Sequence, residues 1–175
     1  MKEGLKIAIS GKSGCGNTTV SRIVAEKLGF TLINYTFHTM AEEKGIPFRE
    51  LHRLAEEDPS YDKYLDRKQV ELASQGNCVL GSRLAIWMLT DADLKVFLTA
   101  PLEVRAERIR QREGGDAEEV LRETRERDEK DSKRYQKLYG IDNSNFGFAD
   151  LIIDVAGNDQ YETAEKIIQA ARQIE

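Results

Sequence analysis

The residues whose types and spacing point most directly to chemistry lie between positions 5 and 19, which read LKIAISGKSGCGNTT. An apolar run enters a turn marked by Gly11, Gly14 and Gly16, and two threonines then open an amphipathic helix. A strand, a glycine-rich turn and a helix in this order form a loop that binds nucleotide phosphates. The stretch therefore predicts a site for a nucleoside triphosphate, and the alternative is a glycine-rich turn without a ligand.

One position departs from the phosphate-loop pattern, which places a lysine before the serine or threonine that begins the helix. Thr18 and two glycines match the pattern, whereas Asn17 stands where the lysine belongs. Removing one preorganised donor from a site that stabilises developing charge typically lowers the rate roughly 100- to 1,000-fold. Lys12, inside the loop, is a candidate replacement for the missing cation, and we predict a catalytic role for it.

The remaining properties of the loop do not depend on that lysine. Glycines permit positive φ angles, so successive backbone N–H groups point into one concavity, and the start of the helix adds further free N–H groups. The Thr18 hydroxyl is placed to reach a magnesium ion bound to the phosphates. We predict that the triphosphate contacts a continuous run of residues, namely Gly11, Lys12, Ser13, Gly14, Cys15, Gly16, Asn17, Thr18 and Thr19.

Alternating strand and helix patterns must position this loop. Apolar runs with strand character span residues 5–10, 31–34, 78–81, 94–99 and 151–155. Between them, one helix ends at Gly29, two or three short helices fill 37–76, two longer helices span 101–112 and 116–139, and a last one follows the fifth strand. This alternation predicts an α/β fold with a five-stranded parallel sheet flanked by helices. Ligands bind beyond the carboxyl ends of such strands, where the glycine loop and Ser82–Arg83 lie.

Clustered arginines follow the fourth strand. Arg105, Arg108 and Arg112 recur at helical spacing, and the next helix carries Arg127, Asp131 and Arg134 at i, i+4 and i+7. Phosphoryl transfer needs such cations, because negative charge spreads over the transferred group, and arginine offers a fixed fork of donors. The alternative is a solvated helix held by i, i+4 pairs such as Glu123–Arg127 and Arg127–Asp131.

Composition bounds the class of protein. The 175 residues suffice for a single domain, and 40% hydrophobic with 33% charged residues is typical of soluble globular chains. The net charge of −5 argues against a general nucleic-acid binder. No apolar run approaches the length of a membrane span and no signal peptide is visible, so we expect no membrane association and a cytoplasmic location. Cys15 and Cys78 have no zinc-site spacing and are expected to be free thiols.

Several longer stretches resemble the cytidylate kinases, most closely the short form typical of archaea. The likeness covers nearly the whole chain. Its most specific markers are APLEVRAERI and the pattern R-D-x-x-D-S-x-R from Arg127 to Arg134, beside FHTMAEEKG, AEEDPSYDKYLDRKQVELASQGNCVL and the Arg-Leu-x-x-Trp of residues 83–87. The resemblance implies a nucleoside-monophosphate kinase fold with a P-loop, a monophosphate-binding helical region at about 36–76 and a short lid at about 112–133.

The same resemblance implies an activity and roles for residues. The expected reaction transfers phosphate from ATP, with Mg²⁺ held partly by Thr18, to CMP or dCMP in a monomeric enzyme. Arg127 and Arg134 resemble arginines that hold the acceptor and stabilise the transferring group. Asp131 resembles the aspartate that works with them at the sugar. The other implied contacts are Arg83 and His38 to the acceptor, and Arg108 and Arg112 to the ATP phosphates.

Three positions depart from the family pattern, and all lie at the chemistry. Asn17 replaces the loop lysine, His38 stands at an arginine position, and Gly81 with Ser82 precedes Arg83 where an acidic residue and a glycine are expected. For His38 the alternative is a surface histidine at a helix start. We therefore keep two rivals to a (d)CMP kinase: a nucleotide-binding protein with weak or no catalysis, and a kinase for another small acceptor.

Overall fold

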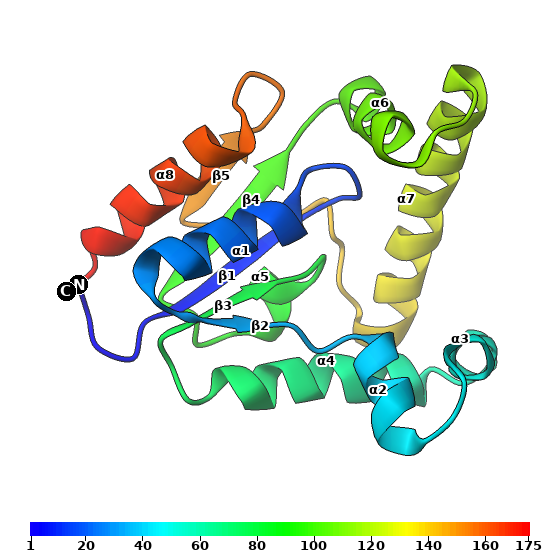
Figure 1. Ribbon diagram of the computed structural model, residues 1–175, viewed down its shortest axis with the longest axis horizontal. Coiled ribbons are helices and arrows are strands. Elements are labelled where there is room, and N and C mark those ends of the chain that lie inside the picture. Colours follow the sequence, from blue (N-terminus) through cyan, green and yellow to red (C-terminus); the bar gives the residue numbers. More distant parts are fainter.

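The computed structural model describes all 175 residues and contains one five-stranded sheet in the order β2-β3-β1-β4-β5 (Figure 1). Every neighbouring pair of strands is parallel. The five expected strands are confirmed to within one residue at each end. Their bounds are β1 Lys6–Gly11, β2 Thr31–Ile33, β3 Cys78–Gly81, β4 Leu94–Thr99 and β5 Leu151–Asp154.

Eight helices connect and cover the strands. The expected helices are present, and the region 37–76 contains three. The short helix α5 directly after the Ser82–Arg83 segment was not predicted, because four residues are too few to show a helical period. The bounds are α1 Asn17–Leu28, α2 Phe37–Lys44, α3 Phe48–Glu57, α4 Ser60–Ala73, α5 Ala85–Met88, α6 Leu102–Glu113, α7 Ala117–Tyr139 and α8 Gln160–Arg172.

Local chemistry accounts for several helix ends. The α1 helix stops at Gly29, whose φ of 69° is the left-handed conformation that glycine adopts at low cost. The Asp116 carboxylate caps α7 by accepting from the N–H groups of Glu118 and Glu119. Pro101 lies just before α6 rather than at its first residue, a shift of one position from the expectation. Since each end has its own stop or start signal, the helix boundaries were largely readable from sequence.

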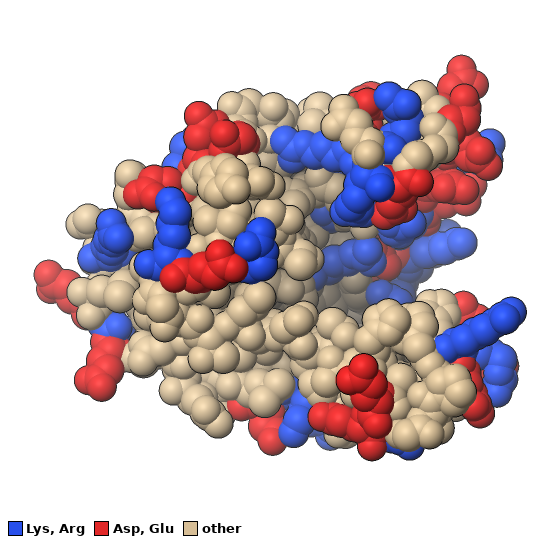
Figure 2. All heavy atoms as spheres, viewed as in Figure 1, with Lys and Arg blue, Asp and Glu red and all other residues tan.

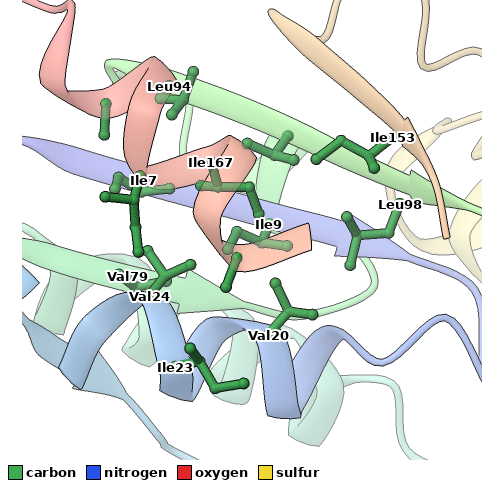
Figure 3. Close-up of a cluster of buried hydrophobic side chains, with 14 of the residues drawn as sticks. Ile7, Ile9, Val20, Ile23, Val24, Val79, Leu94, Leu98, Ile153 and Ile167 are labelled. Carbon is green, nitrogen blue, oxygen red and sulfur yellow. The ribbon is translucent and has the colours of Figure 1, made fainter. Parts of the chain in front are cut away.

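Two apolar layers sandwich the sheet. On one face, Ile7 and Ile9 of β1 pack with α1 and α8 in the largest buried cluster (Figure 3). On the other face, Ala8 and Phe97 pack with α4 and α5. Alternate β1 residues thus enter opposite layers, as expected for a strand that is buried on both faces.

The remaining helices stand beyond the carboxyl ends of the strands. The α6–α7 pair lies on one side of this edge and the α2–α3 pair on the other, as Figure 1 shows. The glycine-rich turn after β1, the Ser82–Arg83 segment after β3 and the turn after β4 all open between them. No helix is both long enough and apolar enough to cross a bilayer.

Candidate active site

The glycine-rich turn presents free backbone donors. Gly14 and Gly16 have φ angles of 85° and 87°, and Gly16 precedes α1 without any side-chain cap. Within the turn only the Cys15 N–H donates to another backbone group, the Lys12 carbonyl. The other N–H groups of the turn and of the first helical turn, those of Ser13, Gly14, Gly16, Asn17, Thr18 and Thr19, have no backbone acceptor. Such an array binds phosphate oxygens.

The side-chain amide of Asn17 is bonded within the loop. Its Nδ2 donates to the Gly11 carbonyl over 2.6 Å, and its buried Oδ1 has no partner. A Cβ on Gly11 would lie 2.6 Å from that Oδ1, so the first glycine is needed for close packing rather than for a positive φ. The short amide therefore ties the two ends of the loop together and adds no charge toward a ligand.

A polar hollow of about 300 Å³ lies in front of the loop. Its lining contains neither an apolar side chain nor a carboxylate. Figure 2 shows lysines and arginines gathered in the hollowed side of the molecule, although the chain as a whole carries a charge of −5. The four cations that line the hollow are Lys12, Arg83, Arg112 and Arg127. An anionic ligand is the chemistry that this concentration of positive charge favours.

Lys12 and Arg127 are the cations of the hollow that form no ion pair within 4.0 Å. The alternative reading of α7, with Glu123–Arg127 and Arg127–Asp131 pairs, is not what the structure shows, because neither pair forms. Asp131 instead accepts from Arg83 over 2.5 Å and lies 3.3 Å from Arg134. Arg127 is therefore available to a ligand.

Arg105 has a scaffolding role that the sequence did not reveal. Its side chain is 6% exposed and donates two hydrogen bonds to Asp128, at 3.1 and 2.6 Å. It also donates to the backbone carbonyls of Ser13 and Ala100. Arg105 thus fixes the phosphate loop against α6 and α7. Its spacing resembled that of its neighbours, and only the fold shows that it points inward.

A second cavity, of about 250 Å³, adjoins the hollow and shares Ser82 and Arg83 with it. It is enclosed by α4, α7 and the segment between β2 and α2, and it combines tyrosine and leucine side chains with acidic ones. Arg83 enters from the hollow side and donates to the Ser13 hydroxyl over 2.7 Å. Arg134 lines the same cavity, 3.7 Å from Asp62. The cavity suits an organic group that carries a phosphate.

A third cavity, of about 510 Å³, adjoins the hollow on its other side and shares Gly16 and Thr19 with it. Arg108 lines this cavity and donates to the Val155 carbonyl over 2.5 Å. Only Arg112, of the two arginines expected at ATP phosphates, lines the polar hollow itself. Arg108 is positioned beside the start of α8, where the rest of a nucleotide bound at the loop would lie.

Two further predicted residues, His38 and Cys15, have side chains that pack against other parts of the protein. His38 is exposed and stacks on Phe48 of α3, with ring centroids 3.7 Å apart, and it lines none of the three cavities. The Cys15 side chain is 2% exposed, and burial raises the pKa of its thiol, partly offset by Arg105. The thiol therefore belongs to the core and the Cys15 N–H is bonded to the Lys12 carbonyl, so the predicted contact of Cys15 with the triphosphate stays a prediction.

Comparisons with known proteins identify the family of the chain. The cytidylate kinase-like family matches residues 6–156 of the chain. Cytidylate kinase 2 of Borreliella afzelii (strain PKo) is 49% identical over 167 residues, covering 93% of this chain and 94% of that protein. The cytidylate kinase of Pyrococcus horikoshii is 43% identical over 157 residues, covering 89% and 82%. A solved shikimate kinase of Bacteroides thetaiotaomicron has the same fold, with a TM-score of 0.62, 21% identity and coverage of 97% and 96%.

Proposed function

The chain belongs to the cytidylate kinase-like family, and from this membership we propose that it transfers the γ-phosphate of ATP to CMP or dCMP. The observation that carries the proposal is the order of the three cavities. A cationic hollow without carboxylates separates two cavities that can each hold a nucleoside. Two nucleotides bound end to end would bring their phosphates together in the hollow, which is the geometry that transfer between them requires.

In this arrangement ATP lies on the Arg108 side, with its phosphates on the loop N–H groups and near Arg112. The acceptor lies on the Arg83 side. An oxygen of the acceptor phosphate attacks the γ-phosphorus, the bond from that phosphorus to the β–γ bridging oxygen breaks, and ADP leaves. No general base is needed, because the acceptor oxygen is already anionic, so catalysis rests on positioning and charge stabilisation.

Four side chains would supply that stabilisation. Arg127 and Lys12, which have no internal ion pair, would face the transferring group. Arg83 and Arg134 would grip the acceptor phosphate. When the phosphate takes the place of Asp131 on Arg83, the released carboxylate can accept from a sugar hydroxyl. The backbone-bound amide of Asn17 takes no part, which leaves Lys12 as the loop's own positive charge.

The donor set also fits Mg²⁺ that arrives with ATP. Thr18 lines the hollow at the start of α1 and offers a hydroxyl oxygen. Magnesium keeps several water ligands and commonly takes only one or two protein oxygens beside phosphate oxygens. The absence of a carboxylate from the hollow's lining is compatible with that pattern. When bound, the ion would neutralise charge on the β- and γ-phosphates.

We assign two flanking segments to substrate closure. Residues 36–76 would form the monophosphate-binding region, and residues 112–133, which end α6 and begin α7, would form the lid. Closing both over the hollow would exclude water and suppress hydrolysis of ATP.

A coupled ATP-consumption assay with CMP, dCMP, UMP and AMP tests the proposal. We expect turnover with CMP or dCMP and little with AMP. Arg127→Ala should lower kcat by about 1,000-fold, in line with arginines that stabilise phosphoryl transfer. Arg122→Ala is the matched control, because Arg122 is exposed on the same helix and faces only glutamates. Preference for AMP, or undiminished turnover in Arg127→Ala, would refute the proposal.

Binding without turnover would favour the non-catalytic rival, whose motivation is the departure from the family pattern at Asn17, His38 and Gly81. Titration of ATP and CMP by calorimetry in the same preparations separates that outcome from loss of the fold.

A further inference from the structure

The second cavity, which we assign to the acceptor, has one wall whose chemistry is not explained by the phosphate-binding roles of Arg83 and Arg134. Asp62, Asp66 and Gln69 project from α4 at i, i+4 and i+7 and line the cavity together. Asp62 lies 3.7 Å from Arg134 and so has a cationic partner within the protein. The other two side chains face the cavity without any cation within 4.0 Å.

Asp66 retains a free acceptor oxygen. Its Oδ2 accepts from the Tyr139 hydroxyl, and its Oδ1 has no hydrogen-bond partner. Burial raises the pKa of this carboxyl, and the hydroxyl bond lowers it. A half-buried carboxylate without a counter-ion is unfavourable unless a donor satisfies it. Since the protein supplies only the tyrosine, the second donor is expected to come from the ligand.

Gln69 adds a second acceptor beside Asp66. The residue is 9% exposed, and its Nε2 donates to the Tyr35 carbonyl over 3.0 Å. Its Oε1 receives no hydrogen bond from the protein, and Gln69 is one of the residues that line the cavity. The Tyr35 hydroxyl is turned away to Glu43. This wall therefore presents acceptor oxygens, and its nearest protein donors are already engaged.

We propose that Asp66, supported by Gln69, selects cytosine by accepting hydrogen bonds from its exocyclic amino group. Cytosine carries that N–H₂ donor where uracil carries a carbonyl acceptor. Uracil would place its oxygen against the carboxylate and leave the acceptors unsatisfied, which is the situation that rejects an analogue most strongly. Tyr139 acts as a positioning residue, because its hydroxyl fixes the carboxylate. The inference rests on the proposed function, since it assigns the base end of the same acceptor site.

The test compares kcat/KM for three acceptors in the wild type and in Asp66→Asn. The acceptors are CMP, UMP and the 2-pyrimidinone ribonucleotide, which is CMP without its amino group. An amide can turn its NH₂ group toward a carbonyl, so Asp66→Asn should narrow the preference for CMP over UMP by about 10- to 100-fold. Replacing CMP by the 2-pyrimidinone ribonucleotide should lower kcat/KM of the wild type by about 10- to 100-fold. The same replacement should lower kcat/KM of Asp66→Asn by less than about threefold.

Glu71→Gln is the matched control, because Glu71 is an exposed carboxylate on the same helix that pairs only with Lys68. It should retain the wild-type preference. Asp66→Asn should keep the melting temperature of the wild type, since it removes an uncompensated charge and leaves an acceptor for Tyr139. Should that variant fail to fold, the 2-pyrimidinone comparison in the wild type decides alone.

The outcomes separate the two proposals. A wild type that does not phosphorylate CMP overturns the proposed function. A wild type that prefers CMP, with the same preference and the same loss for the 2-pyrimidinone ribonucleotide in Asp66→Asn, overturns only the assignment of Asp66.

Discussion

At the scale of single residues, the phosphate loop carries its positive charge at position 12 and has an amide at position 17. Asn17 is turned back to the Gly11 carbonyl, and Lys12 lines the hollow without an ion pair. Arg105 differs from Lys12, because its guanidinium donates to the Asp128 carboxylate and to the Ser13 carbonyl of the loop. Lys12 thus lines the hollow without a protein partner, whereas Arg105 is bonded within the scaffold.

Lys12→Ala should lower kcat roughly 100- to 1,000-fold with little change in the melting temperature, because the side chain stabilises developing charge and holds no internal partner. Lys12→Arg should retain most activity. Adding Asn17→Lys to Lys12→Ala should restore part of the rate by returning a cation to the helix start. The steady-state assay measures all three, and Lys27→Ala on the far end of α1 serves as control. An unchanged kcat in Lys12→Ala would show that the loop works without its own charge.

At the scale of elements, α1 lies so close to β3 that no side chain fits at position 81, where the family pattern has an acidic residue. A Cβ on Gly81 would lie 2.1 Å from Ser21 Oγ and 2.7 Å from Ser21 Cβ. Ser21 is 1% exposed, and its hydroxyl has no partner. The acidic residue expected at this position therefore cannot be restored alone, and the departure at Gly81 is a property of the helix–strand contact.

Gly81→Ala should accordingly lower the free energy of unfolding by about 1–3 kcal/mol through overpacking. Ser21→Gly in the same chain should recover part of that loss, limited by the helix penalty of glycine, about 1 kcal/mol. Urea unfolding measures both. Gly147→Ala provides the comparison, because its Cβ would meet no atom within 4 Å, and it should change stability by less than about 0.5 kcal/mol. Equal effects at both glycines would contradict the close approach.

Sequence predicted these elements well and their mutual contacts poorly. The strands are continuous apolar runs, and the helix ends carry local signals such as Gly29 and Asp116, so both could be read from neighbouring residues. The contact of Asp66 with Tyr139, and that of Ser21 with Gly81, join residues far apart in the chain. Spacing cannot show such contacts, because they depend on how closely two elements pack. The stacking of His38 on Phe48 is another such contact, and the role of His38 at the acceptor stays a prediction.

At the scale of the whole molecule, three adjoining cavities form one path across the carboxyl edge of the sheet. The third cavity and the polar hollow share Gly16 and Thr19, and the polar hollow and the second cavity share Ser82 and Arg83. The surrounding chain is acidic, but the hollow in the middle is lined by cations (Figure 2). One ligand with a nucleoside at each end should therefore occupy the full path.

Adenosine and cytidine joined through five phosphates should stabilise the protein more than ATP and CMP added together at the same concentration, because linking the ligands removes one association cost. When the linked ligand is present at a hundredfold excess over its Kd, the free energy of unfolding should rise by about 2.7 kcal/mol relative to the protein without ligand. Thermal melts measure the gain, and raising the salt concentration should reduce it because the contacts are ionic. A rise no larger than that with ATP alone would mean that the cavities do not act as one path.

The contacts of Arg83 bear on how the protein releases what it has made. The Arg83 guanidinium donates to the Asp131 carboxylate and to the Ser13 hydroxyl. A phosphate that binds Arg83 must compete with the Asp131 carboxylate for the hydrogen bonds of the guanidinium. On the proposed role of Arg83, this competition would weaken the binding of every anion at the acceptor site, inorganic phosphate included. If Arg83 grips the acceptor phosphate as proposed, the same competition would shorten the residence of the diphosphate product.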